Sequence, residues 1–221
     1  GNDGSFGETV TTSTGADAFS PGFCGGGATG ATRDNGCDSD GGEFEYGARL
    51  GYDIALPSGL LIGAVAEVSR SSIADRTSAF STTPAFYEFS REIDYTAALR
   101  ARAGLVADAA LFYVTAGVAG AKMDNAFESS NTANSFTQNN ADDFVIGYQA
   151  GAGAEFGLTD NVSLGVEYLY NRFDHDDYSV TVGQGTAGAT NPFVLAGGVT
   201  MRPEETVFAW HAVRASLNFR F

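Results

Sequence analysis

The sequence predicts an all-β protein, an antiparallel up-and-down transmembrane β-barrel of eight strands. Three observations support this fold class: long stretches in which apolar residues alternate with small or polar ones, a strict alternation of short and long connections, and a high glycine content. The chain has 29 glycines among 221 residues, about 13% against a usual share of roughly 7%. Glycine is unfavourable inside helices, and here it recurs singly within apolar stretches, unlike in a flexible linker.

The alternation identifies the expected strands. In 93–107, the odd positions, such as Ile93 and Leu99, form an apolar face, and the even positions include Arg100 and Arg102; this period of two is typical of a strand. The segments are 14 to 16 residues long, whereas ordinary strands have five or six and a membrane-crossing strand needs roughly 9–11. Seven segments follow the pattern, the second, fourth and sixth less cleanly: 43–56, 60–73, 93–107, 111–126, 143–158, 162–177 and 206–221.

The connections between these segments predict the topology. Short turns are expected at 57–59, 108–110 and 159–161, and long, solvated extracellular loops at 74–92, 127–141 and 178–205. Outer-membrane barrels show this asymmetry of short periplasmic turns and long outside loops. Because bacterial single-chain barrels have an even number of strands, an eighth strand is expected at 1–12, short or partly preceding Gly1, and a further extracellular loop at 13–41. Residues 1–221 then form a single barrel domain.

The two cysteines, Cys24 and Cys37, lie in the Gly- and Asp-rich stretch CGGGATGATRDNGC. They have neither a CxxC spacing nor a histidine nearby, which argues against a zinc site. We expect a disulfide that closes this short loop in an oxidising compartment. Two free thiols are the alternative.

Charged residues also occur on the inward faces of the expected strands. Five acidic and five basic residues balance there, and all except Arg220 are assigned to a lumen charge network: Glu45, Asp53, Glu67, Glu155 and Glu167 with Arg49, Arg100, Arg102, Arg214 and Arg220. The interior of an eight-stranded barrel is just wide enough to be filled by side chains, and unpaired buried charges cost several kcal/mol each. We therefore expect a plugged polar core of ion pairs; the alternative is a narrow path gated by these pairs.

Two segments carry a resemblance to a known family. The C-terminal WHAVRASLNFRF (210–221) looks like the closing strand of small outer-membrane barrels of Gram-negative bacteria, and GAGAEFGLTDNVSLGVEYLY (151–170) resembles the penultimate hairpin of the same group. That group is the porin-family, or opacity-type, eight-stranded barrels common in alphaproteobacteria. The resemblance is good over 143–177 and 206–221, fair over 43–126 and absent over 1–42.

The resemblance implies an integral, multi-pass protein of the bacterial cell outer membrane without conserved catalytic residues. It also implies that Phe219 and Phe221, at the end of the closing strand, are the assembly signal read by the barrel-assembly machinery during insertion. The expected function is a structural or surface-interaction role with a side-chain-filled lumen. A narrow porin-like diffusion channel is the alternative, a lipid-modifying enzyme is less favoured, and a soluble β-sandwich is the remaining possibility for the fold.

The charge balance limits the partners. The chain has 12 basic and 27 acidic residues, a net charge of −15, which argues against nucleic acid because phosphate neutralisation needs a basic face. The expected partners are outer-membrane lipids and lipopolysaccharide. An envelope protein or a second copy of the chain is a further possibility.

Acidic clusters are weak candidates for metal binding. Carboxylates close together can hold Ca²⁺ or Mg²⁺, and the candidates are Asp38 and Asp40 in the first loop and Asp174 and Asp176 at the entrance to another. Their spacing does not match an EF-hand. Solvated acidic loops are the plainer interpretation, and we expect no other cofactor.

Enzymatic function has little support in the sequence. The histidines are His175 and His211; His175 with Asp177 and Ser179 is too local and exposed for a convincing triad, and His211 is expected at the outer interface. The aromatic residues are expected in two interfacial belts. The outer belt comprises Phe44, Tyr46, Tyr95, Phe144, Tyr168, Tyr170 and Trp210, and the inner belt Tyr52, Phe112, Phe156, Phe219 and Phe221.

Overall fold

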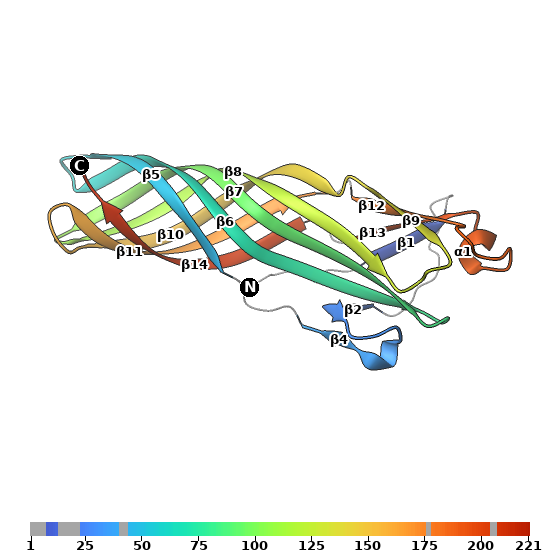
Figure 1. Cartoon of the computed structure of the whole chain (residues 1–221). Helices are drawn as coiled ribbons and strands as arrows, with labels where there is room; N and C mark the ends of the chain where they lie inside the picture. The colour runs from blue at the N-terminus through green and yellow to red at the C-terminus, as the bar shows by residue number, and fades with distance from the viewer. Residues whose placement is uncertain (1–7, 13–22, 40–43, 176–177, 204–206) are drawn as a thin grey trace.

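Seven long strands form the main sheet of the computed structural model, which describes residues 8–12, 23–39, 44–175, 178–203 and 207–221. Neighbours in the order β14-β11-β10-β8-β7-β6-β5 are antiparallel (Figure 1). The all-β prediction is thereby confirmed. The strands are β5 (Glu45–Ala55), β6 (Leu60–Ser81), β7 (Ala85–Ala107), β8 (Ala110–Ser129), β10 (Asp142–Gly157), β11 (Val162–Asp174) and β14 (Val207–Phe219).

The three expected short turns are confirmed. They join β5 to β6, β7 to β8 and β10 to β11 at the end of the molecule where the C-terminus lies (Figure 1). Gly59 and Asp108 adopt positive φ angles of 78° and 53° in two of these turns, a conformation that glycine and aspartate tolerate better than most residues.

The two faces of the strands differ as the alternation predicts. On β14, Val213 is 76% exposed, whereas its neighbour Arg214 faces inward. On β7, Leu99 is 59% exposed and Arg100 only 1%. An outward apolar face of this size is stable where hydrocarbon covers it, as on membrane barrels.

A β-bulge reverses one prediction. The pairing of β7 with β8 shifts between Ile93 and Tyr95, and that of β6 with β7 shifts between Arg70 and Ile73. One extra residue in a strand exchanges its two faces beyond that point. Ile93, expected on the outward face with Leu99, is therefore fully buried inside.

The prediction of a barrel strand at 1–12 is wrong for residues 8–12, the part that the structure describes. Residues Glu8–Thr12 form β1, which pairs with β13 (Val199–Pro203) away from the main sheet. β5 and β14 are the sheet edges; they run in the same direction, and no backbone hydrogen bond joins them among the described residues. Side chains do bridge them, for example Arg49 Nη2 to Asn218 Oδ1 at 2.8 Å. Strands lie about 4.8 Å apart, so one more strand between these edges would separate them by roughly 10 Å. The described residues place no such strand there, and the count of eight stays a prediction.

The long connections, which we expected to be solvated extracellular loops, contain regular secondary structure in their described residues. In 74–92, β6 and β7 continue as one hairpin, and they reach 22 and 23 residues. The connections 127–141 and 178–205 contribute β9 (Ser135–Asn139), β12 (Ser179–Gly183), the helix α1 (Pro192–Leu195) and β13. The three strands and β1 form a second sheet, ordered β1-β13-β12-β9. This sheet lies beside the hairpin at the far end of the molecule (Figure 1). We call this hairpin extension, second sheet and helix the cap.

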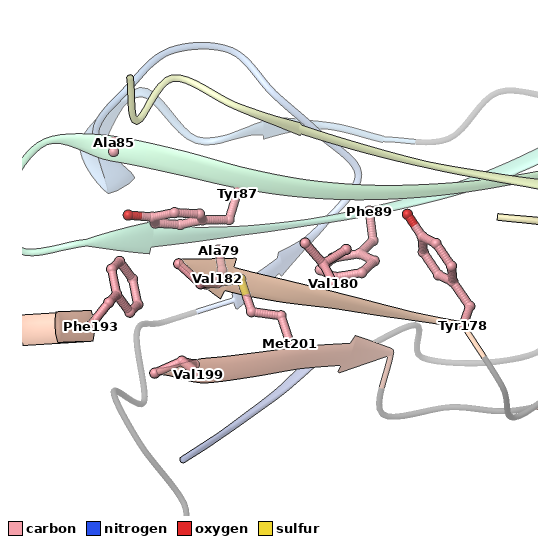
Figure 2. Packing of buried hydrophobic residues seen from close by; sticks show 10 residues of the cluster. All are labelled: Ala79, Ala85, Tyr87, Phe89, Tyr178, Val180, Val182, Phe193, Val199 and Met201. Carbon is pink, nitrogen blue, oxygen red and sulfur yellow. The ribbon is translucent and has the colours of Figure 1, made fainter. Parts of the chain in front are cut away.

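The cap has its own hydrophobic core. Side chains of β12 and β13 face those of the β6–β7 hairpin, and Phe193 of α1 adds to them (Figure 2). Phe89 is fully buried, with its ring centroid 5.0 Å from that of Phe127 and 5.7 Å from that of Tyr178. Because the apolar residues of the long connections are buried in this way, these segments fold. The core residues are Ala79, Ala85, Tyr87, Phe89, Tyr178, Val180, Val182, Phe193, Val199 and Met201.

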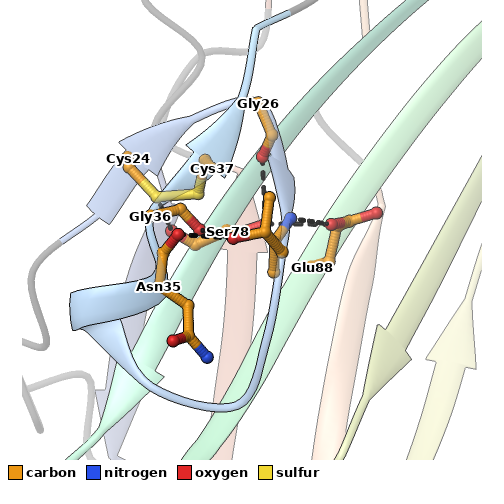
Figure 3. Close-up of a disulfide and its surroundings, with 9 residues drawn as sticks. Cys24, Gly26, Asn35, Gly36, Cys37, Ser78 and Glu88 are labelled. Carbon is orange, nitrogen blue, oxygen red and sulfur yellow. Dashed lines mark hydrogen bonds between the residues drawn. A yellow bond between two sulfur atoms is a disulfide. The ribbon is translucent and has the colours of Figure 1, made fainter.

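The predicted disulfide joins Cys24 to Cys37 and is confirmed. It closes a small unit made of β2 (Phe23–Gly25), β3 (Gly27–Ala28), a 3₁₀ turn (Arg33–Asn35) and β4 (Cys37–Asp38). This unit docks on the cap hairpin: β2 pairs with β6, Ser78 Oγ donates to Gly26 O at 2.9 Å, and the Glu88 carboxylate accepts from Ala28 N at 2.6 Å (Figure 3). The expected loop at 13–41 is thus ordered between residues 23 and 39.

In the described part of the chain, no helix has the length and apolar character needed to cross a bilayer.

The cap core generates a test. We expect Phe89→Ala to destabilise the cap by about 3–5 kcal/mol, because it leaves a cavity beside the two rings that contact Phe89 edge to face. Limited proteolysis of the cap across a urea series measures the change. Leu195→Ala is the control, since Leu195 on α1 is 72% exposed and its loss should cost less than about 0.5 kcal/mol. Equal protease resistance of the two variants would contradict a packed cap.

Candidate functional site in the lumen

The inward faces of the strands enclose an interior, here called the lumen. Its lower part, toward the short turns, holds the charged residues that the alternation predicts. β5 supplies one arginine and two acids, β7 supplies two arginines, and β6, β10, β11 and β14 supply one charged residue each. These are Glu45, Arg49 and Asp53 on β5, Glu67 on β6, Arg100 and Arg102 on β7, Glu155 on β10, Glu167 on β11 and Arg214 on β14.

Arg100 is at the centre of one group of ion pairs. Its Nη2 lies 2.8 Å from Glu67 Oε2, and its Nη1 lies 3.3 Å from Glu167 Oε2. Arg214 bridges Glu67 and Glu45. These contacts join β5, β6, β7, β11 and β14 across the lumen.

Arg102 is at the centre of a second group. Its Nη1 lies 2.6 Å from Glu155 Oε1, it also pairs with Asp53, and its guanidinium carbon lies 4.8 Å from the centre of the Tyr113 ring. Arg49 joins the two groups, because its guanidinium lies 3.6 Å from both Glu155 and Glu167.

The structure therefore brings all nine residues of the lumen charge network into one connected set, and Arg220 adds a contact to Glu155 at 3.3 Å. Five acids face five arginines, so the set is electrically neutral. Neutrality matters because removal of one partner from a buried pair leaves a charge without compensation.

An apolar layer lies above the charge network, toward the cap. It is formed by buried side chains from β7, β8, β10, β11 and β14. The Phe173 and Trp210 rings stack at 5.4 Å and 14°. The apolar layer consists of Ile93, Ala98, Ala119, Ala121, Met123, Val145, Phe173, Phe208 and Trp210.

The apolar layer corrects the prediction for Trp210. We expected this residue in the outer aromatic belt, but it is 1% exposed and inside the lumen. The alternation already placed Trp210 and Phe208 on the inward set with Arg214, and this signal was stronger than the general preference of tryptophan for interfaces. The other members of the two belts lie on the outward face; Phe144, for example, is 55% exposed.

One buried pair at the junction with the cap was missed. Arg91 Nη2 lies 2.8 Å from Asp75 Oδ2, and its guanidinium lies 4.5 Å from the centre of the Phe208 ring. Both charged residues fall in 74–92, which was expected to be a loop. The continued alternation of that segment could have revealed them.

The metal candidates are not brought together. Asp38 and Asp174 are exposed, on β4 and at the end of β11, and Asp40 and Asp176 lie outside the described residues. Among the residues that are described, no three His, Cys, Asp or Glu side chains form a group that could hold a metal ion.

The two histidines have other partners. His175 Nε2 lies 3.2 Å from Asn125 Nδ2, and its Nδ1 lies 3.7 Å from Asp143 Oδ2, while Asp177 lies outside the described residues. His211 hydrogen-bonds Tyr168 and stacks on it on the outward face. Phe219 ends β14 and is exposed, as is Phe221; their role in assembly stays a prediction.

The charge network generates a second test. Glu167→Ala removes a partner of both Arg100 and Arg49, so we expect it to lower the free energy of unfolding by about 3 kcal/mol. A urea titration followed by the fluorescence of the one tryptophan of the chain measures this change. The matched control is Asp94→Ala, which removes the exposed pair with Arg70 and should cost less than about 1 kcal/mol. An unchanged unfolding midpoint for Glu167→Ala would show that the lumen pairs do not stabilise the fold.

Comparisons with known proteins agree with this architecture. The 31 kDa outer-membrane immunogenic proteins of Brucella melitensis biotype 1 and Brucella suis biovar 1 are each 28% identical over 187 residues, 83% of this chain and 69% of theirs. The 25 kDa outer-membrane immunogenic protein of Brucella ovis is 35% identical over 95 residues, 40% of this chain and 42% of that protein. No solved structure matches the chain.

The family model described as "Outer membrane protein beta-barrel domain" matches residues 9–190, which is most of the chain. The expected resemblance to outer-membrane barrels is thereby confirmed, as is the expected location. The chain belongs to the outer membrane protein beta-barrel domain family and is an integral protein of the bacterial outer membrane.

Proposed function

We propose that this protein is a non-conducting structural protein of the outer membrane that presents a folded cap at the cell surface. The observation that supports the proposal is the set of side chains on the inward faces of the strands. A neutral network of buried ion pairs occupies the lower part of the lumen, and the apolar layer lies above it. An ion would have to separate paired charges and then pass between packed apolar side chains and the hydrogen-bonded hydroxyls of Ser69 and Thr96, and both steps are unfavourable.

The cap supports the surface part of the proposal. Its hydrophobic core and the disulfide-closed unit hold the outer surface in one conformation, whereas solvated loops would fluctuate. The Brucella relatives are named outer-membrane immunogenic proteins. We propose that the cap of this chain is the part that contacts molecules outside the cell. An envelope protein or a second copy of the chain is the kind of partner expected.

The outward faces of the strands and the acidic outer surface define the other proposed partners. Exposed apolar side chains such as Leu50, Leu99 and Val213 would contact lipid tails, with interfacial aromatics at the headgroups. Lipopolysaccharide phosphates would contact the acidic surface through divalent cations. We propose no catalytic role and no resident cofactor.

A narrow diffusion channel is the competing function, and conductance separates the two. We expect the purified, folded protein to give no discrete current steps in a planar bilayer, because ion pairs and packed apolar side chains occupy the inward faces of its strands. The heat-dependent shift of barrels on a gel establishes that the sample is folded, and an open porin under the same conditions establishes that the assay detects conduction. Reproducible steps whose size changes in Arg100→Ala would put an ion path through the lumen and overturn the proposal.

A further inference from the structure

Five inward-facing residues lie side by side across the lumen. The register pairs Arg100 of β7 with Gly117 of β8, Gly117 with Gln149 of β10, Gln149 with Asn171 of β11, and Asn171 with Trp210 of β14. We call these five residues the polar row. It lies at the boundary between the charge network, to which Arg100 belongs, and the apolar layer, to which Trp210 belongs.

The polar side chains of this row are completely enclosed. Gln149 and Asn171 are 0% exposed, and Arg100 and Trp210 are 1% exposed. Several of their polar atoms nevertheless make no hydrogen bond to any residue that the structure describes: Arg100 Nε, Gln149 Oε1 and Nε2, Asn171 Oδ1 and Trp210 Nε1. Buried polar side chains almost always have a partner, and each one without a partner costs about 1–3 kcal/mol.

A flip of the Gln149 amide does not supply the missing partners. Rotating the Gln149 amide by half a turn exchanges its two ends, and both remain without a partner. Three of its four neighbours on the inward face are glycines, namely Gly117, Gly147 and Gly151, which carry no polar side chain. The Asn171 amide already donates from Nδ2 to Trp210 O at 3.5 Å, so its Oδ1 is the end that needs a donor.

We propose that ordered water molecules bind along the polar row. The row offers donors at Arg100, Gln149 and Trp210 and acceptors at Gln149 and Asn171, and water is the small molecule that can serve both kinds of atom. Buried water of this type typically makes about three hydrogen bonds to otherwise unsatisfied groups. An ion is the poorer ligand, because Arg100 is already neutralised by Glu67 and Glu167 and the other residues of the row are uncharged.

The waters extend the polar interior up to the apolar layer and end there. The next inward positions toward the cap are Ala98, Ala119, Gly147, Phe173 and Phe208, which pair with one another in the same order and offer no polar side chain. This inference goes beyond the proposed structural function, since bound water in the lumen is compatible with either result of the conductance experiment.

The sole tryptophan of the chain makes the proposal testable. Protein labelled with ¹⁵N-tryptophan and folded in micelles has one indole N–H signal, that of Trp210. We expect nuclear Overhauser and rotating-frame cross-peaks of opposite sign between this proton and water, the signature of a long-lived water contact as opposed to chemical exchange. Asn171→Leu, which replaces the neighbouring acceptor by an apolar side chain with the same number of heavy atoms, should abolish or strongly weaken them. Gln149→Met is the second variant and should weaken them.

Gln138→Met is the matched control, because this glutamine lies on β9 in the cap and its amide oxygen already accepts from Tyr178 Oη at 2.7 Å. The cross-peaks between the Trp210 indole and water in this variant should equal those of the unmodified protein. Absence of cross-peaks in the folded unmodified protein would overturn the proposal. Cross-peaks of unchanged intensity in both Asn171→Leu and Gln149→Met would also overturn it, since the water would then not be held by the row.

Discussion

The structure depends on one constraint: each long strand has an apolar face and a face that carries charge, and the charges can be enclosed only if they neutralise one another. Five acids and four arginines from six strands meet inside the sheet, and Arg220, which follows β14, adds a contact to Glu155. Because the partners come from different strands, the same contacts that compensate the charges also hold the curled sheet together. The side-chain contacts of Arg49 and Arg214 extend this connection across the edge strands β5 and β14, which share no backbone hydrogen bond in the described chain.

The interior changes character along its length. Toward the short turns it is charged, and in the middle it becomes neutral and polar. Toward the cap Phe173, Phe208 and Trp210 pack together, beside the buried pair of Arg91 and Asp75. The cap then adds a second hydrophobic core outside the main sheet. The inward faces of the described strands carry closely paired or packed side chains, and packed strands and a disulfide order the described part of the cap. Both features support the proposed structural role over a solute path.

Much of the candidate site followed from the alternation of residues. Knowledge of which positions face inward was enough to select Glu67, Arg100 and Glu167, because a period of two assigns faces without knowledge of the partners. The same rule also carried the information needed for Phe208 and Trp210. It failed at Ile93, because the β-bulge beside that residue exchanges the two faces of the strand. A bulge arises from the pairing of two strands, and one strand's sequence does not reveal it.

The sequence by itself determined the fold class, the membrane-facing side of the strands, the three tight turns and the disulfide, since each depends on local pattern or composition. Only the tertiary structure decided which arginine pairs with which acid, that the long connections fold into a cap, and that Glu8–Thr12 pairs with β13 instead of entering the main sheet. These outcomes depend on contacts between segments far apart in the chain. Local periodicity predicts that a segment forms a strand, but the free energy of packing determines which strand or sheet that segment packs against.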